Sequence, residues 1–489
     1  MNKRYKRFVS ILLLAALLLA GCGSEASDTK ANDTNATDVT DTTAETMQQD
    51  NLPSGLDFGG ETVSVYVRGD NVNTEFDAEE SGDIVDDAIY KRNRAVEERL
   101  NVKLSYFANT TEDAWGERDK YMNTIRGSVM SDDGSIDLVG SSSVYNPIMA
   151  REGLFFNLLV DDMPYLDFMQ PWWSESLINE MAVDGRLYTA SGDASLGLIK
   201  GMMCFYFNKE LTEAFQIPDL YETVQSGQWT LGKMHEYVTL AYHDLNGNTK
   251  ADEEDRLGLI IDNQNYGTNF YTSCGLKMID KNEEGIPFIA VGSERVVEVL
   301  DRLAGMFVQP GYSVGMDETE LTQTFLEGRA LFYAGEFAST EKFREVEFDF
   351  GVIPFPKYDE EQEEYLTAAR NTYTGFSIPV TADKEMVAAV LEAMGSESWR
   401  TVSPAYYEQA LKVKYSRDDV SSQMYDLIRS GIVFDYGLAH NLVLDNLSVN
   451  LRVQIVGALG TWTSVYASKK TQWETLLEEY LADIAELEE

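Results

Sequence analysis

Thr62-Val63-Ser64-Val65-Tyr66-Val67 is the stretch that decides the fold class, once it is read with the segments that follow it. It alternates and is rich in β-branched residues, which is typical of a strand. An amphipathic helix follows, because apolar residues spaced by four and seven between Val85 and Leu100 share one face. Val102–Tyr106 and Asp137–Gly140 read as further strands. Strands that alternate with helices predict an α/β body with a largely parallel sheet.

The loops after these strands are the favoured places for a site. Ligands of parallel sheets bind beyond the carboxyl ends of the strands. The loop Ser141–Asn146 follows a predicted strand, so Tyr145 within it is a candidate ligand residue, with an ordinary surface loop as the alternative. There is no internal repeat and no second linker, which favours two lobes sharing one interwoven chain.

The first 22 residues have the pattern of a bacterial lipoprotein signal. Four basic residues between Lys3 and Arg7 precede the apolar run Phe8–Leu19, which is too short to span a bilayer. The run ends in Leu19-Ala20-Gly21-Cys22, a lipobox pattern. The sequence predicts a signal peptide over residues 1–21 and lipid attachment, such as palmitate, at Cys22. The protein is then expected on the extracellular face of the cell membrane; the alternative is an ordinary secretory signal with a chance cysteine.

The composition changes abruptly after Cys22. The segment Gly23–Asn51 is polar and has no aromatic residue, so it cannot bury enough apolar surface to offset its ordering entropy. We therefore expect residues 22–55 to form a lipidated, disordered tether and residues 56–489 to form the folded body.

The charge balance excludes one class of partner. The chain carries a formal net charge of −43, and loss of the signal peptide's four basic residues leaves the mature chain near −47. A body with this much negative charge is repelled by phosphate backbones and anionic lipids. We therefore reject nucleic acid as a partner. Besides Cys22 the chain has only Cys204 and Cys274, which either pair or stay as buried thiols.

Signals of catalysis are mostly missing. His235-Glu236 has Thr239 where a zinc protease needs its second histidine, and the residues around Ser195 lack the spacing of a nucleophile elbow. A glycosidase needs only two carboxylates, which 82 acidic residues cannot exclude. We expect a protein that is not an enzyme.

Several motifs stand in order along the body. They are Ala88–Glu98, Gln170–Trp173, Phe207–Leu211 with Gln228–Thr230, Phe325–Ala330 and Ile353–Tyr358. Together they resemble the carbohydrate-type extracellular solute-binding proteins (family 1) of bacterial ABC importers, in their lipoprotein form. The likeness runs from about Val63 to about Tyr436, and residues 442–489 match less clearly.

The resemblance implies two α/β lobes joined by crossing hinge strands. The first lobe is expected over about 60–190 and 376–430, and the second over about 200–370 with C-terminal helices over 431–489. It further implies a monomer that captures a sugar or oligosaccharide in the inter-lobe cleft and delivers it to permease subunits. Three alternatives stay open: another solute such as a polyol or peptide, a tethered glycan-processing enzyme, and an adhesion or sensor protein. The identity, length and linkage of a sugar are not readable from the sequence.

The ligand candidates combine this resemblance with the chemistry of sugars, whose faces pack on aromatic rings and whose hydroxyls bind carboxylates or amides. Asp193 follows a glycine turn near the implied first hinge, although a turn or cap role is the alternative. The other candidates lie at a strand end, before the implied second hinge, or in tryptophan positions: Glu336, Arg370, Asn371, Tyr373, Trp172, Trp173 and Trp462.

A calcium loop is expected at Asp244–Asp255. Oxygen side chains stand at positions one, three, five, nine and twelve, and position seven would offer its backbone carbonyl, as in an EF-hand loop. These positions are Asp244, Asn246, Asn248, Asp252, Asp255 and Lys250. Thr249 replaces the glycine usual at position six, so weak binding is expected, with a solvated acidic turn as the alternative. The ion's role would be structural.

Overall fold

The structure is a computed structural model that describes residues 48–111, 114–249, 252, 254–262, 266–343, 346–415, 419–456 and 460–487. The predicted signal peptide, the lipid site Cys22 and most of the predicted tether lie outside these residues. All described residues belong to one compact unit, residues 47–489. Within the described part of the chain, no helix combines the length and apolar character needed to cross a membrane.

The first lobe is built on a four-stranded sheet of order β11-β3-β1-β2. Its strands are β1 (Glu61–Val67), β2 (Val102–Phe107), β3 (Leu138–Ser142) and β11 (Thr374–Ser377). β1 pairs in parallel with β2 and β3, while β11 runs antiparallel to β3. The three strands expected from the sequence are therefore present and parallel, and the late strand β11 returns to complete the sheet.

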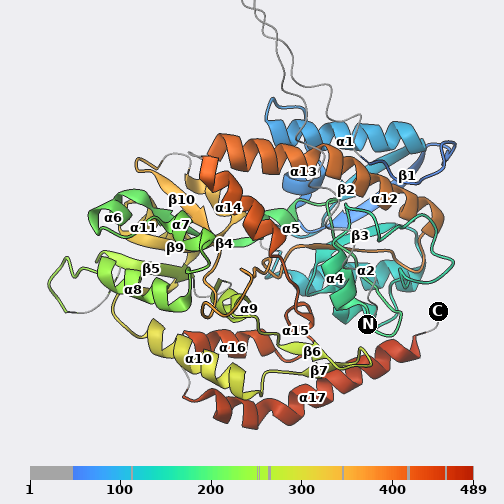
Figure 1. Ribbon diagram of the computed structural model, residues 1–489. Helices are drawn as coiled ribbons and strands as arrows, with labels where there is room; N and C mark the ends of the chain where they lie inside the picture. Colours follow the sequence, from blue (N-terminus) through green and yellow to red (C-terminus); the bar gives the residue numbers. More distant parts are fainter. Residues whose placement is uncertain are drawn as a thin grey trace, which may run out of the picture. The chain divides into compact units, whose positions relative to one another are not determined.

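Helices α1 (Ile84–Leu100) and α12 (Lys384–Arg400) pack side by side in this lobe although they are 284 residues apart (Figure 1). The carboxylate of Asp83 caps α1 by accepting a hydrogen bond from the Val85 amide, and Asn101 ends the helix with φ 48°. Other helices of the first lobe and its loops are α2 (Arg118–Ser131), α3 (Asn146–Ala150), α4 (Glu175–Met181) and α13 (Val402–Pro404).

The second lobe is built on a five-stranded sheet of order β10-β4-β9-β5-β8. The strands are β4 (Met203–Asn208), β5 (Leu257–Asp262), β8 (Tyr312–Met316), β9 (Ala330–Glu336) and β10 (Phe350–Ile353). β5 pairs in parallel with β8 and β9, and β4 runs antiparallel to β9 and β10. The sheet is thus mixed, with its parallel part around β5.

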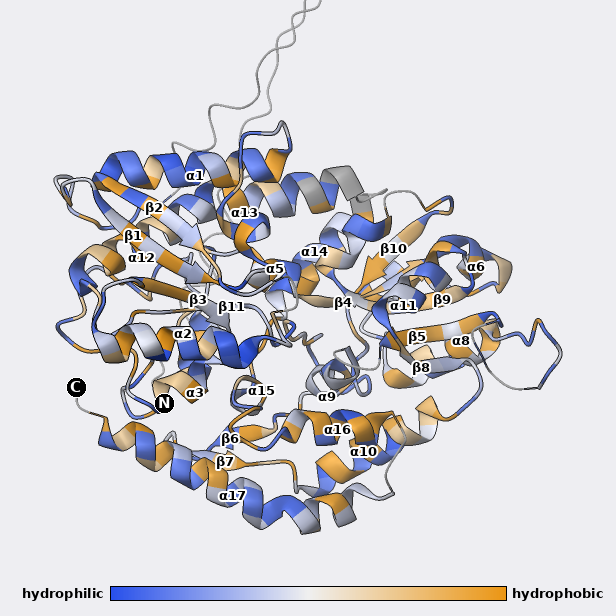
Figure 2. Cartoon of the chain, turned by 180° about the vertical axis from the view of Figure 1, so that it is seen from behind, coloured by the Kyte–Doolittle hydropathy of each residue, from blue (hydrophilic) through white to orange (hydrophobic). Residues whose placement is uncertain are grey.

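Short helices surround this second sheet. They are α6 (Lys209–Ala214), α7 (Leu220–Gln225), α8 (Leu231–Ala241), α9 (Asn269–Ser273), α10 (Glu294–Phe307), α11 (Glu318–Leu326) and α14 (Asp419–Ser430). α14 packs against β10 of this sheet, although the sequence prediction placed residues up to about 430 in the first lobe. In Figure 2 the strands β5 and β10 are largely hydrophobic, whereas α1 carries hydrophilic residues along much of its surface.

Two chain segments cross between the lobes and pair with each other. In the first lobe Ala190 and Phe376 exchange backbone hydrogen bonds of 3.0 and 2.7 Å. Toward the second lobe, the Met203 amide donates to the Ala368 carbonyl at 3.1 Å, and the Arg370 amide donates to the Gly201 carbonyl at 2.7 Å. The crossing segments 190–203 and 367–376, with the short helix α5 (Gly197–Lys200) in the first, form the hinge.

The C-terminal region touches both lobes. It contains α15 (Tyr436–Ala439), α16 (Leu447–Ile455) and α17 (Trp462–Glu486), and it lies against the hairpin β6 (Ile279–Lys281) and β7 (Pro287–Ile289). Figures 1 and 2 both show α17 running from α10 and α16 past this hairpin. Near its end, Asp483 pairs with Arg151 of the first lobe. The C-terminal helices therefore belong to neither sheet alone.

Candidate functional site

The described residues enclose a cleft of about 820 Å³. It is bordered by the loop after β1, the end of β9, helix α9, the two crossing segments and the region of α15 and α16. Its walls therefore come from both lobes and from the C-terminal region. A cleft of this size and position is where a small ligand is expected in a two-lobed protein.

The first-lobe wall follows the carboxyl end of β1. Arg68 forms an ion pair with Asp70 and donates from Nη1 to the Thr372 carbonyl of the second crossing segment at 3.1 Å. Asn71 donates to Thr374 Oγ1 at 3.2 Å, and that hydroxyl donates to Glu75 Oε2 at 2.9 Å. Polar groups on this wall are thus largely tied to one another and to the hinge.

The second-lobe wall is centred on Glu336 at the end of β9. Its Oε1 lies 3.3 Å from Arg370 Nη1. Burial raises the pKa of Glu336, while the neighbouring Arg370 opposes that shift. The carboxylate in turn holds the pKa of Arg370 above its usual range. Asn269 of α9 lies beside the same crossing segment, because its Oδ1 accepts a hydrogen bond from the Ala368 amide at 2.9 Å.

Four polar atoms of this second wall are buried without a hydrogen-bond partner among the residues that the structure describes. They are Asn269 Nδ2, Thr272 Oγ1, Glu336 Oε2 and Arg370 Nε. A buried polar atom without a partner costs about 1–3 kcal/mol. The set contains donors and acceptors, which is the combination that hydroxyl groups complement.

The third wall comes from the C-terminal region. Asn441, Asn446, Ser448 and Arg452 line the cleft there. Asn441 Oδ1 accepts hydrogen bonds from the amide and the hydroxyl of Ser448, at 2.9 and 2.8 Å. This wall adds amide and hydroxyl groups, and it lies partly in the stretch 442–489 where the sequence motifs match less clearly.

Two aromatic side chains border the cleft. Trp115, on the loop between β2 and α2, is 47% exposed, and the Arg118 guanidinium lies 5.5 Å from its ring centre. Tyr373 lies on the second crossing segment and is 8% exposed. Trp115 is therefore the side chain best placed to offer an open ring face to a ligand.

Four of the residues selected from the sequence line the cleft: Glu336, Arg370, Asn371 and Tyr373. The structure brings them together because the end of β9 lies beside the second crossing segment. Their contact with a ligand stays a prediction.

Tyr145 and Asp193 do not line this cleft. Tyr145 is fully buried behind Trp115, with the two ring centres 6.0 Å apart, so it supports the wall from behind. Asp193 lies in the first crossing segment with its amide bonded to the Trp172 carbonyl at 2.9 Å. Burial raises the pKa of Asp193 to about 6, and Arg429 opposes this shift. Its place is inside the body, facing α14 and away from the cleft.

The three candidate tryptophans are also absent from the cleft. Trp172 and Trp173 both donate their indole N–H to the buried carboxylate of Glu392 on α12, at 3.1 and 2.9 Å. Trp462 is fully buried and donates to the Val291 carbonyl at 2.7 Å. All three side chains are held by the core, because each indole finds its polar partner there.

The sequence interpretation missed Arg68, Asp70, Glu75 and Trp115. A signal for them was present, since they follow the carboxyl ends of β1 and β2 as Ser141–Asn146 follows β3. Applying the same rule to all three strands would have selected these loops. Asn269 and the α16 residues carried no comparable signal.

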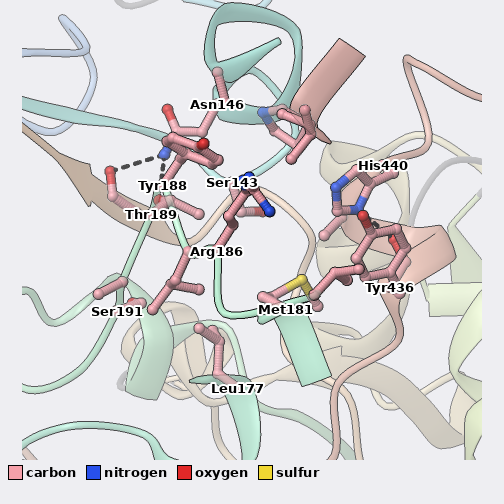
Figure 3. A pocket seen from close by; sticks show the side chains of 18 of the residues that line it. Ser143, Asn146, Leu177, Met181, Arg186, Tyr188, Thr189, Ser191, Tyr436 and His440 are labelled. Atoms are coloured by element: carbon pink, nitrogen blue, oxygen red, sulfur yellow. Dashed lines mark hydrogen bonds between the residues drawn. The ribbon is translucent and has the colours of Figure 1, made fainter. Parts of the chain in front are cut away.

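A second pocket of about 40 Å³ lies behind the hinge (Figure 3). Figure 3 shows Tyr436 and His440 on one side of it and Asn146 with Thr189 on another. The His440 ring stacks on Tyr436 with 3.7 Å between ring centres, and burial lowers the pKa of His440 to about 3. Tyr373 lines both this pocket and the cleft. The pocket is far smaller than the cleft and mostly apolar.

The predicted calcium loop folds around Asp244. Its carboxylate accepts hydrogen bonds from the Gly247 amide at 2.6 Å and the Thr249 amide at 2.8 Å. Thr249 adopts φ 64°, the left-handed conformation that the usual glycine would take at this position. Asp255 is fully buried and accepts from the Leu245 amide at 2.9 Å.

The remaining calcium positions face Asp252. Asn246 and Asn248 donate to its carboxylate at 3.1 and 2.6 Å, and Lys250 lies outside the described residues. Within the described ranges, no three His, Cys, Asp or Glu side chains are grouped as a metal cluster. Calcium binding therefore stays a prediction. Cys204 and Cys274, whose pairing the sequence left undecided, are both free, buried thiols.

No family model and no curated protein matches the chain. Solved structures do match it. The GacH receptor of Streptomyces glaucescens, studied with acarbose, is 12% identical with a TM-score of 0.55 over 86% of this chain and 99% of that one. A maltotriose-bound maltose/maltodextrin-binding domain from Bdellovibrio bacteriovorus is 13% identical, with a TM-score of 0.53 over 86% and 100%.

A third match is an ABC substrate-binding protein of Listeria monocytogenes in complex with cycloalternan, 12% identical with a TM-score of 0.52 over 87% and 98% of the two chains. The three matches span nearly the whole length of proteins that bind carbohydrates. The present chain thus has the two-lobed α/β fold of carbohydrate-type extracellular solute-binding proteins of ABC importers, which confirms the fold that its sequence motifs predicted.

Proposed function

We propose that this protein is the extracellular solute-binding subunit of an ABC importer and that its ligand is a sugar or an oligosaccharide. The observation that carries the proposal is the cleft, whose second-lobe wall holds four buried polar atoms without partners among the described residues. Sugar hydroxyls both donate and accept hydrogen bonds, so they match such a mixed set. The carbohydrate ligands named for the structural neighbours support the same ligand class.

We infer delivery to a permease from the hinge. The crossing segments pair with each other, and cleft residues such as Arg370 and Tyr373 belong to one of them. A ligand held by both lobes favours the closed arrangement, and closure changes the outer surface that permease subunits would contact. We infer that the protein acts as a monomer, one ligand per cleft.

We infer its location from the N-terminal sequence. Lipid on Cys22 would anchor the body to the extracellular face of the cell membrane, with the polar segment up to about residue 55 as a spacer. This inference rests on the basic residues, the short apolar run and the lipobox pattern.

A screen of the full chain tests the ligand class. Thermal unfolding is followed in the presence of neutral sugars, oligosaccharides, polyols and short peptides. A ligand at 100 times its dissociation constant adds about 2.7 kcal/mol to the free energy of unfolding. A shift with saccharides supports the proposal, whereas a shift with peptides alone contradicts it.

The same screen separates binding from catalysis. A binding protein returns its oligosaccharide unchanged and binds one equivalent, which chromatography and titration measure. Cleavage of the oligosaccharide would identify a tethered glycan-processing enzyme. If the protein binds a saccharide but its cell has no importer permease to receive it, the protein would instead have an adhesion or sensor role.

We also propose that the loop Asp244–Asp255 binds calcium in a structural role. The Asp244 carboxylate accepts hydrogen bonds from two backbone amides of the loop, and Thr249 adopts the left-handed conformation that the loop requires. The loop lies between α8 and β5, so an ion there would steady that connection of the second lobe.

A further inference from the structure

The ion pair of Glu336 and Arg370 is incompletely satisfied at the cleft wall. Glu336 Oε1 lies 3.3 Å from Arg370 Nη1, whereas Glu336 Oε2 and Arg370 Nε are buried and find no partner in the described part of the chain. One acceptor and one donor therefore stand on the same neutral pair. Glu336 is 7% exposed, so water is a poor substitute partner.

Across the cleft stands a second pair of the same kind. Arg68 binds Asp70 through Nε at 3.0 Å and through Nη2, and both residues line the first-lobe wall. The cleft thus presents an arginine–carboxylate pair from each lobe. Each pair offers donors and acceptors without adding net charge, and the other charged residues of the lining are Glu75, Lys200 and Arg452.

Neutral and acidic sugars are expected to form different hydrogen bonds with the pair of Glu336 and Arg370. Of two adjacent hydroxyls, one can donate to Glu336 Oε2 while the other accepts from Arg370 Nε. A uronic acid that places its carboxylate at this pair offers only acceptors there, so it leaves Glu336 Oε2 unsatisfied and sets two carboxylates side by side in a poorly solvated place. Unfavourable contacts of this type exclude a competing ligand as effectively as good contacts select the right one.

We propose that Glu336 is a specificity-determining residue that restricts the cleft to neutral sugars and excludes uronic acids. This inference rests on the proposed sugar-binding function and adds the chemical class of the sugar.

The test measures a ratio of affinities. Isothermal titration at pH 7.5 uses the full chain and six 1,4-linked trisaccharides: the neutral trimers of glucose, galactose and mannose, and the corresponding trimers of glucuronate, galacturonate and mannuronate. The wild type is expected to bind the best neutral trimer at least tenfold more tightly than its acidic counterpart. Glu336→Gln is expected to reduce that ratio at least tenfold, because Arg370 then lacks its carboxylate.

Two further variants make the result specific. Arg370→Gln leaves Glu336 uncompensated and is expected to raise the ratio, so it tests the inference even if Glu336→Gln fails to fold. Glu284→Gln is the control, since Glu284 is an exposed acid of the loop between β6 and β7 and does not line the cleft. It is expected to leave the ratio unchanged.

The outcomes separate the two proposals. Equal or tighter binding of a uronic acid by the wild type overturns the role of Glu336 and leaves sugar binding intact. An unchanged ratio in both Glu336→Gln and Arg370→Gln does the same. Failure of every saccharide, with binding of another solute class, overturns the proposed function and this inference with it.

Discussion

The indole N–H of Trp173 donates to Glu392 Oε2 at 2.9 Å, deep in the first lobe. Trp172 donates to the other oxygen of the same carboxylate at 3.1 Å. Glu392 is 1% exposed and lies on α12, where most of the other buried residues are apolar. One buried acid therefore fixes both rings of the Trp-Trp pair.

This arrangement predicts a pH-dependent stability. Burial raises the pKa of Glu392 from 4.5 to about 7, so between these values the folded state binds a proton that the unfolded state has lost. The stabilisation is fully present below about pH 4.5 and is lost as the pH rises through about 7. A shift of this size corresponds to about 3 kcal/mol.

Urea unfolding at pH 5 and pH 8 measures the effect. The loss of stability between the two pH values is expected to be smaller in Glu392→Gln than in the wild type. Glu385→Gln, an exposed acid on the same helix, is the matched control and should keep the wild-type difference. Equal pH dependence in all three proteins would remove Glu392 as the cause.

Trp115 is expected to contribute to ligand binding. Its ring borders the cleft and is 47% exposed, so a sugar face that covers it removes apolar surface from water. Trp115→Ala is expected to weaken binding of the best saccharide about tenfold, or about 1.4 kcal/mol, in a calorimetric titration. Phe288→Ala is the control, because Phe288 is similarly exposed at 46% but lies on β7 and does not line the cleft. Equal affinities in the two variants would exclude Trp115.

The two ends of α17 are expected to contribute differently to the free energy of unfolding. Trp462 is fully buried near its start, so Trp462→Ala should lower the free energy of unfolding by about 3–5 kcal/mol. The ion pair of Arg151 with Asp483 near its end is about one-third exposed, so Arg151→Gln should cost less than about 1 kcal/mol. Urea denaturation checks both values.

A milder variant tests the earlier ligand assignment of Trp462. Trp462→Phe keeps an aromatic ring in the core, but it removes the larger indole and its hydrogen bond to the Val291 carbonyl. Saccharide affinity is expected to stay unchanged in this variant. A tenfold loss of saccharide affinity in a stable Trp462→Phe protein would show that Trp462 does contribute to the binding site.

Calcium is expected to stabilise the loop that begins at Asp244. Millimolar calcium should raise the thermal midpoint above that measured with chelator, within the affinity range of about 10⁻⁴–10⁻³ M for extracellular modules. Asp244→Ala should abolish the rise, whereas Glu284→Ala, an exposed acid of another loop, should keep it. A rise of equal size in the wild type and Asp244→Ala would show that the ion binds elsewhere.

Lipid attachment at Cys22 is tested by cell fractionation. The wild-type chain is expected in the membrane fraction after a salt wash, and Cys22→Ser is expected in the soluble fraction because its anchor is lost. Cys204→Ser changes a buried thiol of the body and should stay with the membrane. Membrane retention of Cys22→Ser would contradict the anchor.

Local pattern alone predicted the first lobe's strands and its first helix. The alternation of Thr62–Val67 and the helical spacing between Val85 and Leu100 depend on which residues are near neighbours in the chain, and β1 and α1 begin within one residue of the expected positions. The order of motifs also predicted the two-lobed fold. Glu336 and Arg370 were found because a strand end and a hinge are both recognisable in sequence.

Only the tertiary structure decided which side chains face the cleft. Trp462 and Asp193 have the chemistry of a sugar site, yet their side chains turn into the body because Val291 and α14 lie beside them there. The third wall depends on α16 packing against the short helix Tyr266–Thr268, and no local pattern encodes a contact between segments about 180 positions apart. A sequence states which groups are present, whereas packing of distant segments fixes which of them remain open to a ligand.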